Sequence, residues 1–193
     1  ALLIGLGAGS LAKFIYHQLP ATRITAVEID PQVERVARLH FGLPDDPRRL
    51  RVLIADGADY MLQGDSRHDC ILVDGFDGQG RAGALDTLPF YEACRARLSE
   101  SGLLAVNLLG RDRGFAASVE RISQAFTGRS LVFPSCDRGN RIAFASAGEA
   151  VDVAGGELVS RADRWRLASG LNLLPTVARL RQAGCLPHDR LLL

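Results

Sequence analysis

The sequence predicts an α/β fold, in which a doubly wound and mostly parallel sheet of seven strands is covered by helices on both faces. Three observations predict it. Short apolar runs alternate along the chain with segments whose apolar residues recur at helical spacing. A glycine-rich turn follows the first run, and acidic residues end the next three runs. In such sheets the carboxyl ends of the strands form the edge where ligands bind.

The first third of the chain predicts three strand–helix units. An apolar run at 1–5 breaks at glycines, and "SLAKFIYHQL" (10–19) follows it as an amphipathic helix. In the second unit Asp30 is expected to cap a helix that begins at Pro31, because proline fits the first helical position. The further elements expected here are strands at 23–30 and 51–56 and helices at 31–41 and 57–63.

The rest of the chain predicts four more strands and four helices. The last two strands are separated by "CDRGN" (136–140), which resembles a hairpin loop and predicts an antiparallel strand at one edge of the sheet. A glycine-rich linker is expected at 154–156. We therefore expect a Rossmann-like nucleoside-binding domain at 1–150 and a helical extension at 151–193 that packs on it. The expected strands are 69–74, 102–109, 130–135 and 141–146, and the expected helices are 88–98, 115–126, 158–169 and 174–183.

Composition excludes several classes of partner. The chain has 193 residues, and 23 Lys and Arg against 22 Asp and Glu leave a net charge of +1. Nucleic-acid and membrane-surface binding need a concentrated positive field, so neither is expected. No apolar run reaches the ~18 residues that span a bilayer, and no signal peptide is visible. The chain begins at Ala1, inside a predicted strand, so we expect either upstream residues or numbering that starts within a longer protein.

The cysteines and histidines have no metal-type spacing. Free thiols are expected instead of a disulfide framework or a metal centre, which suits a reducing cytoplasm. No metal site is therefore predicted. The residues concerned are Cys70, Cys94, Cys136, Cys185, His17, His40, His68 and His188.

The glycine-rich turn "GLGAGS" predicts a cofactor loop. Its glycines at 5, 7 and 9 let the backbone turn sharply and approach a ligand closely. Glu28 ends the next strand, where a carboxylate can accept hydrogen bonds from both ribose hydroxyls. A nicotinamide dinucleotide would favour Gly or Ala at position 10, where this chain has Ser10.

Asp56, which follows the third strand, has two interpretations. Its carboxylate can accept a hydrogen bond from an adenine amino group, or it can cap the helix that begins at position 57. Taken with the glycine turn and Glu28, it favours an adenosine compound without a pyrophosphate.

The fourth strand ends in "DCILVDGFDGQG" (69–80), with Asp74 and Asp77 three positions apart among glycines. Carboxylates are costly to bury unpaired, so this strand end is expected to meet water, a cation or a ligand. Alkylamines are protonated at neutral pH, and a carboxylate can orient such a group and take its proton during alkyl transfer. The structural alternative is a turn cap at Asp74 and a solvated loop residue at Asp77.

With these motifs the chain resembles the spermidine/spermine synthases, which have the class I S-adenosylmethionine-dependent methyltransferase fold. The resemblance covers roughly residues 1–147. It rests on the order and spacing of "LLIGLGAGSLAKFI", "AVEIDPQVERVARLHFGL", "RVLIADGADYM", "HDCILVDGFDG" and "LDTLPFYEACRARLSESGLLAVNL".

The resemblance implies roles for individual residues. The three glycines of the turn would lie under the methionine-derived part of the donor, and Glu28 would hold the ribose. The adenine would be read by Asp56 and the backbone of Gly57. Asp74 would position and deprotonate the attacking amine, and Asp77 would bind the cationic acceptor. The glycines meant here are Gly5, Gly7 and Gly9.

Two departures from the family affect the expected substrates. Ala8 stands where the family has an acid that holds the donor's aminopropyl ammonium group, so either S-adenosylmethionine or its decarboxylated form is expected as donor. Arg81 adds positive charge near a site meant for cations, and its loop lacks the family's proline-bearing gate.

The function expected is aminopropyl transfer to a small-molecule amine or polyamine, and a homodimer is compatible with the resemblance. The alternatives are a small-molecule methyltransferase on the same scaffold and a degenerate homologue that binds the nucleoside without turnover.

Overall fold

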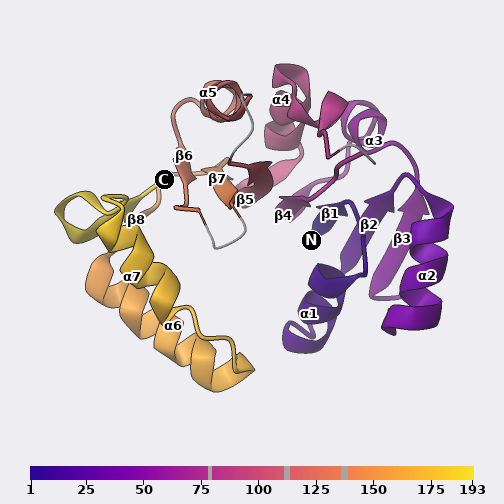
Figure 1. Ribbon diagram of the computed structural model, residues 1–193, viewed down its shortest axis with the longest axis horizontal. Helices are drawn as coiled ribbons and strands as arrows, with labels where there is room; N and C mark the ends of the chain where they lie inside the picture. The colour runs from indigo at the N-terminus through magenta and orange to yellow at the C-terminus, as the bar shows by residue number, and fades with distance from the viewer. Residues whose placement is uncertain (78–79, 111–113, 136–138) are drawn as a thin grey trace.

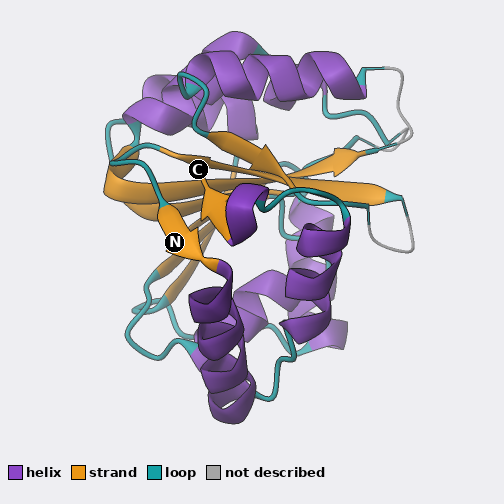
Figure 2. Ribbon diagram, turned by 90° about the vertical axis from the view of Figure 1, so that its left-hand side faces the viewer, coloured by secondary structure: helices purple, strands orange, loops and turns teal. Residues whose placement is uncertain are grey.

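The computed structural model describes residues 1–77, 80–110, 114–135 and 139–193. Within these residues a seven-stranded sheet runs through the centre, in the order β3-β2-β1-β4-β5-β7-β6, with helices on both faces (Figures 1 and 2). The strands are β1 (Leu2–Ile4), β2 (Ile24–Glu28), β3 (Leu50–Ile54), β4 (His68–Val73), β5 (Leu98–Leu109), β6 (Ser130–Val132) and β7 (Asn140–Ser146).

The sheet is mostly parallel, as predicted. β1 pairs in parallel with both β2 and β4, so the strand order changes direction beside β1. β7 is antiparallel to both β5 and β6. The predicted hairpin at the edge is confirmed, although its antiparallel strand lies one place in from that edge. The middle of its expected loop, residues 136–138, lies outside the described residues.

Two hydrophobic cores cover the two faces of the sheet. Successive side chains of a strand point to opposite faces, and β1 shows this directly. Leu2 and Ile4 are buried with α3, α4 and α5, whereas Leu3 is buried with α1 and α2 (Figure 1). The helices are α1 (Ser10–Gln18), α2 (Pro31–Phe41), α3 (Gly57–Gln63), α4 (Leu88–Ala96) and α5 (Phe115–Ala125).

The C-terminal segment differs from the sequence prediction at its start. The expected linker at 154–156 is wrong, because β8 (Asp152–Ala154) leads directly into α6 (Gly155–Ser169). α7 (Leu174–Gln182) lies beside α6, on the same side of the sheet as α1 (Figures 1 and 2). After a short 3₁₀ turn, β9 (Arg190–Leu192) pairs with β8 in an unpredicted two-stranded sheet.

The division at position 150 stays a prediction. The Cys185 thiol, 3.8 Å from the carbonyl oxygen of Val132, contacts the edge strand β6. No helix within the described ranges has the length and apolar character that a membrane span requires.

Candidate active site

A cavity of about 430 Å³ opens at the carboxyl ends of the central strands. Its walls come from the residues that follow β1, β2, β3 and β4, because parallel strands end at the same edge of the sheet. The structure thus brings together all the predicted site residues except Gly9. Those that line the cavity are Gly5, Gly7, Glu28, Asp56, Gly57, Asp74 and Asp77.

The glycine turn closes the bottom of the cavity. Gly5 has a φ of +95°, and a Cβ there would lie 2.3 Å from the carbonyl oxygen of Asp74. Only glycine therefore fits where the end of β1 passes the end of β4. Gly9, predicted to lie under the donor, does not line the cavity. Gly9 has a φ of +72°, and a Cβ there would lie 2.7 Å from Cδ1 of Leu43. Its place under the donor stays a prediction.

Glu28 is held rigidly by backbone groups. Only 9% of the residue is exposed. Its Oε2 accepts a hydrogen bond from the backbone N–H of Leu6 at 2.9 Å, and its Oε1 accepts one from Asp30 at 3.1 Å. Each carboxylate oxygen has further acceptor capacity. The side chain thus fastens the glycine turn to the end of β2 and can still accept hydrogen bonds from a diol.

Asp56 combines features of both interpretations. Its Oδ1 accepts hydrogen bonds from the backbone N–H groups of Ala58 at 2.8 Å and Asp59 at 3.1 Å, which makes it the N-cap of α3. Its Oδ2 accepts no hydrogen bond from the described part of the chain, and the residue lines the cavity. One oxygen therefore caps the helix, while the other remains available to a ligand.

Asp74 is fixed by a residue that sequence reasoning missed. Its Oδ1 accepts a hydrogen bond from Nδ2 of Asn107 at 2.8 Å. Val73 pairs with Val106 in the parallel β4–β5 ladder, so Asp74 and Asn107 are the next positions along the two strands. The available signal was a single polar residue inside the apolar run "LLAVNLL" (103–109).

Asp77 already holds a cation. Its Oδ1 accepts a hydrogen bond from the backbone N–H of Arg81 at 2.8 Å, and its Oδ2 accepts one from the Arg81 Nε at 2.9 Å. The two side chains are 43% and 68% exposed. Arg81 also lines the cavity, so the positive charge expected near this site pairs with one of the two predicted acids.

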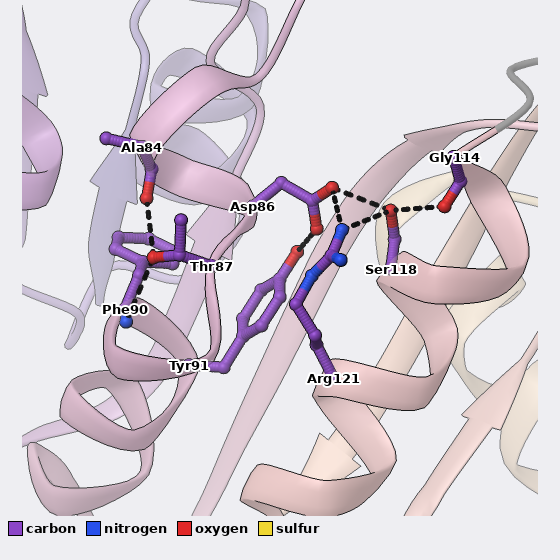
Figure 3. A network of polar contacts seen from close by, with 8 residues as sticks. All are labelled: Ala84, Asp86, Thr87, Phe90, Tyr91, Gly114, Ser118 and Arg121. Atoms are coloured by element: carbon purple, nitrogen blue, oxygen red, sulfur yellow. Dashed lines mark hydrogen bonds and ion pairs between the residues drawn. The ribbon is translucent and has the colours of Figure 1, made fainter.

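A smaller cavity of about 160 Å³ adjoins the first and shares part of its wall, including Gly75, Phe76 and Arg81. Its own lining includes Asn107 and a network centred on Asp86 (Figure 3).

In that network the Asp86 carboxylate accepts hydrogen bonds from the Tyr91 hydroxyl at 2.9 Å and from Oγ of Ser118 at 2.7 Å, and it pairs with Arg121. Burial raises the pKa of the Tyr91 phenol, and the neighbouring carboxylate raises it further. The phenol therefore stays protonated and donates to Asp86.

The sequence matches the family model described as the spermine/spermidine synthase domain over residues 1–108. The chain belongs to this spermine/spermidine synthase family. It is 38% identical over 178 residues to the polyamine aminopropyltransferase of Neisseria meningitidis serogroup A, covering 92% of this chain and 68% of that protein. The predicted family is thereby confirmed, and its named relatives are transferases.

Solved structures of the spermine/spermidine synthase family and of a methyltransferase share the fold. A spermidine synthase in complex with the transition-state analogue AdoDATO has a TM-score of 0.66 and 28% identity, covering 76% of this chain and 54% of that one. Human methyltransferase-like protein 13, in complex with SAH, has a TM-score of 0.74 and 26% identity, covering 94% and 79%. The class I methyltransferase fold is confirmed. The chain spans about two thirds of the curated relative's length and about half of the solved spermidine synthase.

Proposed function

We propose that this chain transfers an alkyl group from an S-adenosylmethionine-type donor to an amine, in the manner of a polyamine aminopropyltransferase. One observation carries the proposal. Asp74 lines the larger cavity, while Asn107, its hydrogen-bond partner, lines the smaller one. A carboxylate at this junction can meet a donor on one side and an amine on the other. We assign the donor to the larger cavity and the acceptor to the smaller.

The larger cavity suits the adenosine part of the donor. Glu28 would accept hydrogen bonds from the ribose hydroxyls, and the uncapped oxygen of Asp56, with the backbone of Gly57, would read the adenine. An apolar wall would cover the base, since pockets of this kind combine apolar surface with a few placed polar groups. That wall contains Val27, Ile29, Val33 and Leu85.

The transfer step assigns a separate role to Asp74. The amine nitrogen attacks the carbon bonded to the donor's sulfonium sulfur. A C–N bond forms, and the C–S electron pair goes to sulfur, which leaves as a neutral thioether. Asp74 orients the incoming ammonium group and takes its proton. Asp77 already pairs with Arg81, so any part it has in binding the acceptor's charge depends on that pair. Gly5 and Gly7 would let the backbone pass close to the sulfonium end of the donor.

The form of the donor belongs to the same proposal. Ala8 offers no carboxylate to an aminopropyl ammonium group. We therefore expect both decarboxylated and intact S-adenosylmethionine to bind. Within the described ranges no cluster of three or more His, Cys, Asp or Glu side chains has the geometry of a metal site. A cytoplasmic location and a homodimer stay predictions.

A methyltransferase is the second candidate. It is favoured by the likeness to methyltransferase-like protein 13, which covers 94% of this chain. Mass spectrometry of a putrescine reaction separates the two candidates. With each donor in turn, an aminopropyl adduct supports the first proposal and a methyl adduct the second. Binding of methylthioadenosine without any product would contradict both and identify a nucleoside-binding homologue.

A further inference from the structure

Three hydrogen bonds join Asp77 and Arg81. The Asp77 N–H donates to the carbonyl oxygen of Arg81 at 2.9 Å, and the Arg81 N–H donates back to the Asp77 carboxylate at 2.8 Å. The Arg81 Nε adds a third contact, 2.9 Å from Oδ2. The guanidinium group is therefore held beside Asp77 by the backbone as well as by charge.

Of the acids near the acceptor cavity, Asp74 has no cation among its described partners. Asp86 lines the smaller cavity, which we assign to the acceptor, and Asp74 and Asp77 line the larger cavity that shares a wall with it. Asp77 pairs with Arg81, and Asp86 pairs with Arg121. The described side-chain partner of Asp74 is the neutral amide of Asn107. A reacting ammonium group is thus attracted to Asp74, while the other two carboxylates already have cationic partners.

We propose that Arg81 determines acceptor specificity by occupying the place of the acceptor's second positive charge. This inference rests on the proposed function. The site then selects an amine for the single ammonium group that meets Asp74. A diamine gains nothing from its second ammonium group unless it displaces Arg81 from Asp77.

Tethering favours Arg81 in this competition. A cation four residues away in the same chain has an effective concentration in the millimolar range or above, which a free diamine must exceed. The pair is also partly exposed, so solvent already screens it and a substituted side chain can be accommodated there. Replacing Arg81 by glutamine should therefore expose the Asp77 carboxylate to the acceptor without disturbing the buried cores.

The test compares putrescine with butylamine, which has the same carbon chain and only one amine. For the wild type we expect kcat/KM values within about threefold of each other. For Arg81→Gln the ratio should rise by about tenfold in favour of putrescine, which is ~1.4 kcal/mol. On its own, Asp77→Asn should leave the putrescine-to-butylamine ratio of kcat/KM as it is in the wild type. Combined with Arg81→Gln, it should abolish the rise in that ratio. Arg48→Gln, at an arginine with a 93% exposed side chain away from both cavities, is the matched control.

Calorimetric binding of the two amines, with methylthioadenosine present, gives the same comparison without turnover. A wild type that favours putrescine by tenfold or more, with Asp77→Asn removing that preference, would overturn the inference. An Arg81→Gln ratio equal to that of the wild type would also overturn it, as would the absence of amine binding in Arg81→Gln. Amine binding that follows the expected ratios without product would instead contradict the proposed transfer reaction and leave the role of Arg81 supported.

Discussion

The side-chain amide of Asn107 donates a hydrogen bond from Nδ2 to Oδ1 of Asp74 over 2.8 Å, across the parallel β4–β5 pair. The backbone N–H of Asp74 is fixed as well, by the carbonyl oxygen of Ile4 at 2.8 Å. The carboxylate is therefore oriented by two neighbouring strands, and its second oxygen is left for a substrate. Such placement matters because small shifts of a reacting group cost large factors in rate.

Replacing Asn107 should slow alkyl transfer without weakening the binding of the donor. We expect Asn107→Ala to lower kcat by roughly tenfold to a hundredfold, because Asp74 loses its orienting donor. The dissociation constant of methylthioadenosine should stay within about threefold of the wild-type value. Asn107→Asp separates orientation from packing. It places two carboxylates side by side, and such a pair retains a proton, so its residual rate should increase with pH. A wild-type kcat in Asn107→Ala would remove Asn107 from the mechanism.

Glu28 should affect both ligand affinity and folding. Glu28→Ala removes the acceptor proposed for the ribose, so calorimetry should show methylthioadenosine binding weakened by about 1.5–3 kcal/mol. It also leaves the N–H groups of Leu6 and Asp30 without their partner, so thermal unfolding should begin at a lower temperature. Glu34→Ala is the control, because Glu34 lies on α2 and pairs with Arg38 outside the cavity. Unchanged affinity in Glu28→Ala would exclude Glu28 from the binding site.

Asp56 allows its two roles to be separated. Asp56→Ser keeps a side-chain oxygen that can cap α3 and removes the second oxygen that faces the cavity. We expect its free energy of unfolding to stay close to that of the wild type while nucleoside affinity falls. Asp56→Ala should lose both, with about 1 kcal/mol of stability lost with the cap. Denaturant unfolding and calorimetry measure the two quantities. Full nucleoside affinity in Asp56→Ser would show that Asp56 is a helix cap alone.

His68, at the start of β4, should make stability depend on pH. Burial, and after it the charge of the nearby Arg97, lowers the pKa of His68 to about 4. An unfolded histidine titrates near 6.5, so between about pH 6.5 and pH 4 the unfolded state takes up a proton that the folded state refuses. Stability should therefore fall as pH decreases through this window. In His68→Gln, denaturant unfolding at several pH values should show a flatter profile, and an equal slope in both proteins would contradict the assignment.

Local chemistry made much of the fold predictable. Asp30 and Pro31 set the start of α2, and the Asp30 side chain accepts a hydrogen bond from Gln32 N–H at 2.8 Å, as an N-cap does. The small β8–β9 sheet was missed because its two three-residue strands lie far apart in sequence. The sequence predicts Gly155 in a linker, but in the structure a Cβ there would lie 2.2 Å from the Asp189 carboxylate. That contact is long-range, and no local pattern contains it.

At the candidate active site, too, local patterns were predictable and long-range contacts were not. The acids at the strand ends could be predicted to converge, because parallel strands place their carboxyl ends at one edge. The partner of Asp74 depends on the register of β4 against β5, which the sequence does not state. The pairing of Asp77 with Arg81 depends on backbone and side-chain contacts that spacing alone does not determine. Gly9 does not line the cavity, and its place under the donor stays a prediction.

Asp74→Asn in a single-turnover experiment tests the central claim most directly. The variant keeps the shape of the side chain and an oxygen for the Asn107 hydrogen bond, and it removes the proton acceptor. With donor bound and amine in excess, we predict that the rate of alkyl transfer falls by roughly two to four orders of magnitude. Donor affinity should stay within about threefold of the wild-type value. Transfer at the wild-type rate would contradict the account and leave Asp74 as a residue that only shapes the turn after β4.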